Sequence, residues 1–166
     1  MKTTRPKHIR YREGQWFAVP LRDGGYAIGI IARGAYKTRG GLGYFFGPRH
    51  DAPPDEEAVQ RLEPADAILI KRFGDLGIIE GRWPLIASSR TFRREDWPLP
   101  KFARLDAVNS TRGWLVEYDY DIEGGGEGRI LRQSRRTAEE LEGSPRDGFS
   151  GAGAIEITLS KLLSKK

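Results

Sequence analysis

The sequence predicts an α+β fold that is predominantly antiparallel β, built as a small bent sheet or half-open barrel with one or two short helices. Short apolar runs recur along the chain, and several alternate apolar with other residues, which is the period of a strand. Glycine-rich turns separate these runs, whereas patterns long enough for a helix are few. At 166 residues the chain can bury one core without disulfides. We expect a basic, flexible N-terminal arm at residues 1–12 and a single domain at residues 13–163.

The N-terminal part of this domain is predicted to be a hairpin followed by a third strand. Residues 16–19 are apolar on both faces and lead to Pro20, which suits a strand end because proline lacks an N–H donor. A turn follows at residues 22–25, where two glycines accept positive φ. Apolar side chains then recur at every second position over residues 26–32, and residues 42–47 form an aromatic run. Glycines inside these strands indicate bends, which favour a bent sheet or half-open barrel.

Fewer signals mark helices in the rest of the chain. Two prolines and three acidic residues predict a short helix that begins near Asp55 and ends near Leu62. Residues 137–141 resemble one helical turn capped by Thr137. Residues 88–112 are rich in proline and charge, so we expect a long ordered connector there. Further strands are predicted at residues 67–70, 83–87, 113–118 and 129–132, and a last one where Ile155, Ile157 and Leu159 alternate.

Composition excludes several classes of protein. The chain has no cysteine, which excludes a disulfide framework and a thiolate zinc site. The first residues lack the apolar core of a signal peptide, and no run approaches the length of a membrane span. The net charge is +5, but eight of the 28 basic residues lie in residues 1–12 and at the C-terminal end. A nucleic-acid-binding domain usually carries its positive charge on the folded surface, so we interpret these ends as solvated and expect a cytoplasmic protein without membrane contact.

Carboxylates alternate at Asp119, Asp121 and Glu123, which a strand would place on one face. With the glycine that follows, they imitate the start of a calcium loop. The twelfth position of such a loop requires a bidentate glutamate, and Ile130 stands there. We therefore interpret the three residues as a solvated strand face and predict no metal site.

Catalytic arrangements are incomplete. Ser150 lies in a sequence resembling a nucleophile elbow, but the last glycine of that motif is replaced by Ala152. The two histidines, His8 and His50, both precede the serine, whereas hydrolases of that type carry their histidine after it. The glycine clusters match no phosphate-binding loop. We predict no catalytic residue and no cofactor, so the chain is expected not to be an enzyme.

Two groups of polar residues are candidates for binding a partner. Arginines at positions 129, 132, 135 and 136, together with Arg93, Arg94, Lys71 and Arg72, could line a phosphate groove, but no aromatic residue is interleaved in the 129–136 run. A solvated edge near two glutamates is the favoured interpretation. Trp97, in a proline-rich loop, is the tryptophan expected to be partly exposed, and aromatic and arginine residues are the usual anchors of protein interfaces.

The motifs resemble those of the immunity protein 26 family of bacterial polymorphic toxin systems. The resemblance rests on glycine, proline and aromatic residues in seven segments and spans roughly residues 11–163. The segments are residues 14–21, 25–31 and 43–47, then 73–77 with 81–86, then 97–100, and finally 151–156. Gln15 stands where the family usually has an acidic residue. The resemblance implies a cytoplasmic toxin inhibitor that neutralises a cognate toxin domain by binding it, without a cofactor, and it fixes no contact residue.

Our hypothesis for the contact surface is a charged face made from the 88–106 loop and the 119–123 edge. It takes in Trp97, Arg93, Arg94, Asp119, Asp121 and Glu123. Polar, irregular segments of this kind are where binding functions concentrate. The alternatives are a nucleic-acid-binding small β-barrel, a hydrolase built on Ser150 or on pairs of acidic residues, and a dimeric structural module.

Overall fold

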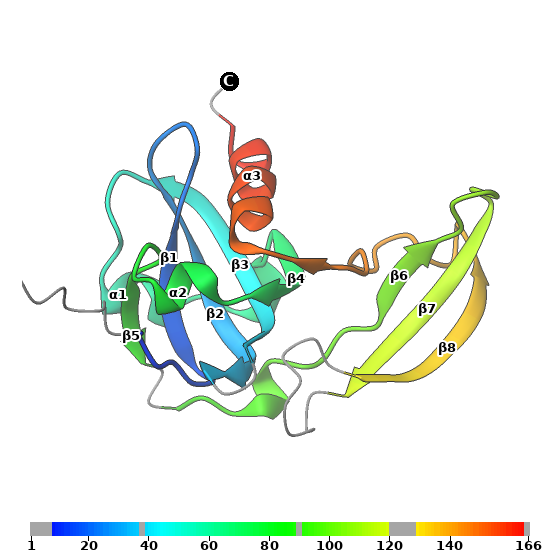
Figure 1. Ribbon diagram of the computed structural model, residues 1–166, viewed down its shortest axis with the longest axis horizontal. Helices are drawn as coiled ribbons and strands as arrows, with labels where there is room; N and C mark the ends of the chain where they lie inside the picture. The colour runs from blue at the N-terminus through cyan, green and yellow to red at the C-terminus, as the bar shows by residue number, and fades with distance from the viewer. Residues whose placement is uncertain (1–7, 37–38, 89–90, 120–128, 165–166) are drawn as a thin grey trace, which may run out of the picture.

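The computed structural model describes residues 8–36, 39–88, 91–119 and 129–164 (Figure 1). The described chain is 42% strand and 19% helix, so β-structure dominates as predicted. Neither of its two sheets closes into a barrel. Of the two predicted forms, the structure therefore has the open sheet. Residues 120–128 and most of the predicted N-terminal arm lie outside the described residues.

The larger sheet has six strands, in the order β5-β1-β2-β3-β4-β9. All neighbours are antiparallel except the short parallel pair of β4 and β9. The strands are β1 (Gln15–Pro20), β2 (Tyr26–Ala35), β3 (Gly40–His50), β4 (Leu69–Gly74), β5 (Leu85–Ser88) and β9 (Phe149–Ser150). The hairpin and third strand predicted from the sequence are thus confirmed.

The smaller sheet is an antiparallel meander in the order β6-β7-β8. It extends to one side of the larger sheet (Figure 1). Its strands are β6 (Phe102–Leu105), β7 (Arg112–Asp119) and β8 (Arg129–Thr137). Strands at the positions of β7 and β8 were predicted, but β6 was not, because its four residues lie in the segment interpreted as a connector.

The tight turn between β1 and β2 is closed by a hydrogen bond from Leu21 N to Gly25 O of 2.9 Å. Gly24 and Gly25 adopt φ of 99° and 78°, which explains the glycine pair in the sequence. A different constraint acts at Gly29, where an added Cβ would lie 2.4 Å from Cζ of Phe17 on the paired strand. The ring of Phe17 occupies the space above this glycine.

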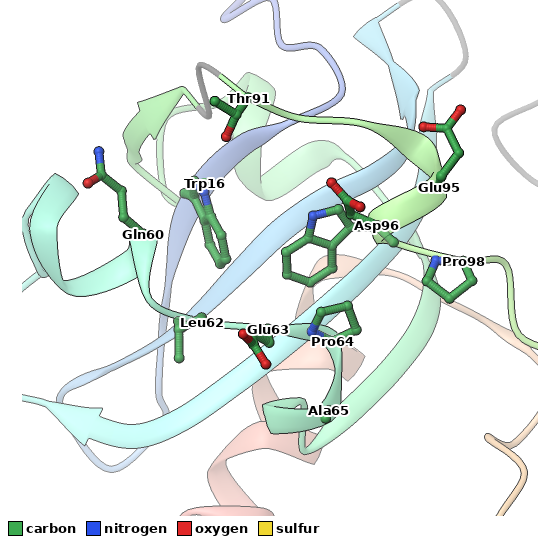
Figure 2. Close-up of a pocket in the computed structure, with 11 residues that line it drawn as sticks. Trp16, Gln60, Leu62, Glu63, Pro64, Ala65, Thr91, Glu95, Asp96 and Pro98 are labelled. Atoms are coloured by element: carbon green, nitrogen blue, oxygen red, sulfur yellow. The ribbon is translucent and has the colours of Figure 1, made fainter.

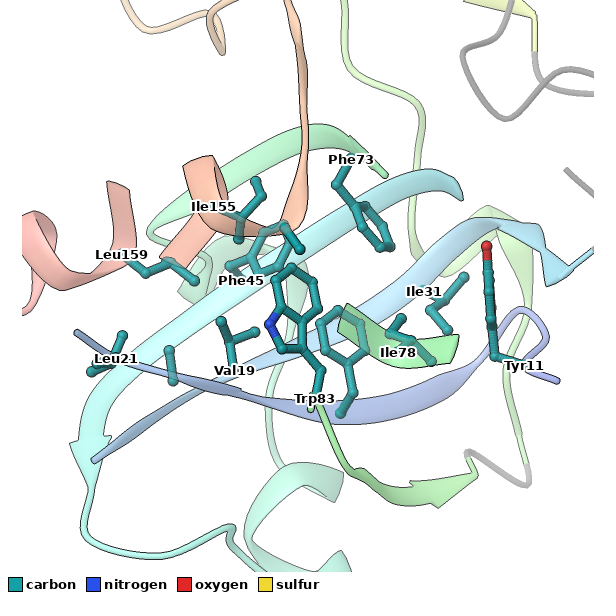
Figure 3. Packing of buried hydrophobic residues seen from close by; sticks show 13 residues of the cluster. Tyr11, Val19, Leu21, Ile31, Phe45, Phe73, Ile78, Trp83, Ile155 and Leu159 are labelled. Carbon is teal, nitrogen blue, oxygen red and sulfur yellow. The ribbon is translucent and has the colours of Figure 1, made fainter. Parts of the chain in front are cut away.

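The larger sheet is buried on both faces, which accounts for apolar residues on both sides of β1. Phe17 and Val19 belong to one cluster, together with Phe45 of β3. Trp16 belongs to a second cluster on the opposite face, together with residues from the second sheet. Figure 3 shows the first cluster, in which residues from helices and strands surround Trp83.

The C-terminal element is a helix, and the strand predicted there is wrong. Helix α3 (Ala152–Leu162) buries Ala152, Ile155, Glu156 and Leu159 against the first cluster, whereas Ile157 is 45% exposed. Spacings of three, four and seven residues describe this face, as expected for a helix. The alternation of Ile155, Ile157 and Leu159 was misleading because the buried Glu156 belongs to the same face.

Two further helices are short. Helix α1 (Glu56–Gln60) is capped by Asp55, whose side chain accepts from Ala58 N at 3.0 Å, as the prolines and acids before it predicted. Helix α2 (Leu76–Ile79) was not predicted. At 137–141 the structure has a turn, and Glu140 N donates to Thr137 Oγ1 at 3.2 Å.

Candidate functional site

A groove lies on the face of the larger sheet that carries the second cluster. It encloses about 960 Å³. It is lined by Trp16 of β1, by five residues between Gln60 and Ala65, and by five residues between Thr91 and Pro98. Figure 2 shows the segment after α1 on one side, the 91–98 segment on the other and Trp16 between them. We call this site the acidic groove, because Glu63, Glu95 and Asp96 are among the residues that line it.

The floor of the acidic groove is aromatic. The rings of Trp16 and Trp97 meet edge-to-face, with centroids 5.7 Å apart. Trp97 also contacts Tyr44 and Phe46 of β3 at centroid distances of 5.2 and 6.1 Å. Only 7% of Trp97 is exposed, so the prediction of a partly exposed side chain is wrong. It packs into the core because the proline-rich segment that carries it is held against the sheet.

Two polar side chains of the sheet hold the 94–98 segment in place. Arg33 of β2 is buried, and its Nη1 donates to Trp97 O at 3.0 Å while its Nη2 donates to Arg94 O at 3.4 Å. Tyr44 donates from its hydroxyl to Pro98 O. Burial raises the pKa of Tyr44, and the positive charge of Arg33 partly offsets this effect. The carbonyl groups of Arg94, Trp97 and Pro98 therefore tie the loop to the strands, which rigidifies it.

The rim of the groove is negatively charged. Glu63 precedes the 3-10 turn Pro64–Asp66, and Glu95 and Asp96 lie in the 3-10 turn Arg94–Asp96. All three side chains line the groove, and none of the lining residues is Lys or Arg. Asp96 pairs with Arg93 at 3.1 Å, in an ion pair whose two side chains are 48% and 69% exposed. The hydrogen bonds that Arg93 donates to Asp96, together with the negative charges of Asp96 and Glu95, raise the pKa of Arg93.

The predicted contact residues fall into two groups. Trp97, Arg93 and Arg94 lie together on the 91–98 segment, where Arg94 pairs with Glu13 at 2.9 Å. Asp119 ends β7 and pairs with Arg129 at 3.6 Å, whereas the predicted Asp121 and Glu123 lie outside the described residues.

The smaller sheet brings the end of β7 that carries Asp119 toward the 91–98 segment. Phe102, just beyond this segment, pairs with Val116, and Lys101 reaches Glu117 at 3.7 Å. Antiparallel pairing therefore directs the end of β7 back along the residues that precede β6.

The other wall of the groove was not predicted from the sequence. Glu63 and its neighbours follow a predicted helix, but nothing in the sequence relates them to residues 91–98. Trp16 gave no signal either, because its place in an apolar strand indicated only a core position. Trp16, the residues near Glu63 and the 91–98 segment come together only because of the order of the strands in the sheet.

The arginines of β8 form an exposed edge, as favoured above. Arg129, Arg132 and Arg136 lie 3.6, 3.7 and 3.6 Å from carboxylates of Asp119, Glu117 and Glu140. The ion-paired edge leaves fewer free cations for phosphates than the sequence alone suggests.

A buried polar cluster links the two sheets away from the groove. Asp147 accepts hydrogen bonds from Arg104 of β6 at 2.6 Å, from Tyr118 of β7 at 2.7 Å and from Arg72 of β4 at 3.3 Å. Burial raises the pKa of Asp147, but the hydrogen bonds from Tyr118 and Arg104 and the charge of Arg72 outweigh it, so the pKa lies below its ordinary value. The guanidinium of Arg72 also lies 4.0 Å from the centroid of the Tyr118 ring. This cluster is structural: it joins three elements through one carboxylate.

The described residues contain no group of three or more His, Asp or Glu side chains suited to a metal ion. Within the same residues, no helix combines the length and apolar character that crossing a membrane requires. Ser150 lies in β9, the two-residue strand that precedes α3.

The family model described as immunity protein 26 matches residues 12–114, which include every residue lining the acidic groove. No curated protein and no solved structure matches the chain.

Proposed function

This chain belongs to the immunity protein 26 family, and on that premise we propose that it binds a cognate bacterial toxin domain and neutralises it by protein–protein contact alone. The family name implies an immunity protein, and such families are generally non-enzymatic. The match over residues 12–114 is the observation that carries the proposal. The proposal includes a cytoplasmic location, where the inhibitor would meet its toxin, and action without a cofactor.

The contact surface that we propose combines the acidic groove with the 91–98 segment and the end of β7. It includes Arg93, Arg94 and Trp97, and Trp97 forms its rigid floor. Asp119 borders it. We extend it to Asp121 and Glu123 on the sequence argument alone. A stable complex buries roughly 1,200–2,000 Å², which requires more than the groove itself.

A rigid scaffold supports this function. The second cluster includes residues from β1, β2, β3, β6 and β7, so one core underlies both sheets. We therefore propose that residues 13–163 act as one domain. A binding surface that is ordered before the encounter loses less conformational entropy in the complex, which favours slow release of a lethal partner.

The test first asks whether the gene beside this one encodes a large secreted protein with a toxin domain at its end, and then uses that domain. Co-expression of this chain should restore growth of cells that produce the toxin domain. Purified chain should bind an inactivated form of that domain in a one-to-one complex, as measured by calorimetry. Growth arrest despite soluble co-expression, or turnover of a substrate by the purified chain, would refute the proposal.

The exposed arginines of β8 leave one alternative to test, a nucleic-acid-binding module. Gel shifts with short RNA and DNA duplexes at low salt should show no complex, because three of these arginines pair with carboxylates. A salt-dependent shift that disappears in Arg132→Glu would favour the alternative.

A further inference from the structure

The acidic groove carries negative charge that the described residues neutralise only in part. Three carboxylates line it, in a protein whose net charge is +5. Among the described residues, neither Glu63 nor Glu95 has a basic side chain within ion-pair distance. Only Asp96 is paired, with the exposed Arg93. An occupant with positive charge would therefore be attracted to the rim, whereas phosphates would be repelled.

The floor presents hydrogen-bond donors without acceptors. Trp16 and Trp97 are 3% and 7% exposed, and each indole carries one N–H donor. A buried indole usually finds an acceptor, as Trp83 does on the opposite face, where Nε1 donates to Glu156 at 2.8 Å. In the part of the chain that the structure describes, neither Trp16 nor Trp97 makes such a bond. Neither indole nitrogen is fully enclosed, and both tryptophans line the groove, so these donors are candidates for hydrogen bonds to an occupant.

We propose, building on the function proposed above, that the acidic groove receives a segment of the toxin domain that carries arginine or lysine. Carbonyl groups of that segment accept from the indole N–H groups of Trp16 and Trp97. Its basic side chain pairs with Glu63 and Glu95 at the rim. The apolar walls, formed by Leu62 and neighbouring prolines, contact the remaining backbone. A peptide supplies carbonyl acceptors and a cation together, which is the combination that floor and rim require.

Charge reversal at the rim tests the electrostatic part. The double variant Glu63→Lys/Glu95→Lys changes two exposed side chains. Its matched control, Asp51→Lys/Glu139→Lys, makes the same change at two exposed acids outside the groove. Binding of the inactivated toxin domain, measured by calorimetry, should weaken about 10- to 100-fold in the groove variant and by less than about twofold in the control. The weakening should diminish as salt is raised.

Nuclear magnetic resonance of the four indole N–H groups tests the floor. Protein labelled with ¹⁵N at tryptophan is titrated with the inactivated toxin domain, and Trp16→Phe and Trp97→Phe assign the signals. The signals of Trp16 and Trp97 should move and exchange with solvent more slowly, whereas that of Trp83 should stay in place because its bond to Glu156 is already formed.

The outcomes separate this inference from the proposed function. Wild-type protein that fails to bind the toxin domain would refute both. Tight binding that is equal in the groove variant and its control, with unmoved signals from Trp16 and Trp97, would overturn the groove inference and leave toxin binding intact. Shifts of these signals on concentrating the chain alone, or on adding an RNA duplex, would assign the groove to a second copy or to nucleic acid and equally overturn it.

Discussion

Replacing Asp147 should loosen the junction between the two sheets. Its side chain is 3% exposed and is shared by Arg72, which is 9% exposed, and by Arg104, which is 42% exposed. Removing one partner of a buried ion pair costs about 3–5 kcal/mol, because the remaining charge stays buried. Loss of the ion pair with the half-exposed Arg104 adds less than about 1 kcal/mol to this cost, since water screens that pair. In Asp147→Ala the hydroxyl of Tyr118 also loses its acceptor, which lowers the free energy of unfolding by about 1 kcal/mol more.

The two substitutions at Asp147 should therefore differ. Asp147→Asn keeps one carbonyl oxygen for Tyr118 and should reduce the free energy of unfolding by about 3 kcal/mol. Asp147→Ala should reduce it by about 4 kcal/mol. Urea denaturation followed by tryptophan fluorescence measures both, with Asp51→Asn as the exposed control. Hydrogen exchange should become faster in β6 and β7 before it does in β1 and β2.

The lowered pKa of Asp147 should also make the stability of the protein depend on pH. Because its folded pKa lies below its unfolded value of about 3.9, its contribution is complete above that value and is lost as pH falls through the folded pKa. The difference in stability between wild type and Asp147→Asn should then be constant near neutral pH and shrink in acid. Equal stability of Asp147→Asn and Asp51→Asn at pH 7 would refute the reasoning.

Three further predictions concern the core. Gly29→Ala should destabilise the protein by about 1–3 kcal/mol, because its Cβ would meet the ring of Phe17 at 2.4 Å; urea midpoints measure this, and a neutral result would contradict it. Ile155→Ala should cost about 2–5 kcal/mol and Ile157→Ala less than about 0.5, since only the first is buried in the helix; equal losses would instead fit an alternating strand. Burial and a neighbouring carboxylate raise the pKa of Tyr11, so Tyr11→Phe should leave the ultraviolet absorbance step near pH 10 unchanged, and a smaller step would show that Tyr11 titrates normally.

The elements that local chemistry determines were predictable from the sequence. The turn at residues 22–25 needs positive φ at two glycines, and the helix after Asp55 has its cap and acidic first turn in sequence. Strand β6 was not predictable in this way, because Phe102 and Ala103 gain their strand character by pairing with Val116 and Leu115, which lie beyond a turn. The helical face of α3 was hidden by its buried Glu156, which reads as polar in sequence but receives the indole N–H of Trp83 from a distant segment.

The candidate site was predictable only on one side. A charged, proline-rich segment around Trp97 indicated a surface role, and the segment does form one wall of the groove. Its opposite wall, near Glu63, depends on β3 and β4 bringing the chain back beside Trp16. The error about the exposure of Trp97 has the same origin, because Arg33 lies far away in sequence and holds the backbone of that segment from another strand.

The contacts of Arg33 also explain how an irregular segment can serve as a precise binding surface. Loops usually lose conformational entropy when they bind, at about 1–2 kcal/mol for each residue that becomes fixed. Here the carbonyls of Arg94 and Trp97 are already bound to a buried guanidinium, and that of Pro98 to Tyr44. The acidic turn is consequently held in place before any partner arrives, and its charges act from fixed positions. A groove assembled in this way combines the variability of a loop sequence with the rigidity of a sheet, and both properties would serve the toxin binding that we propose.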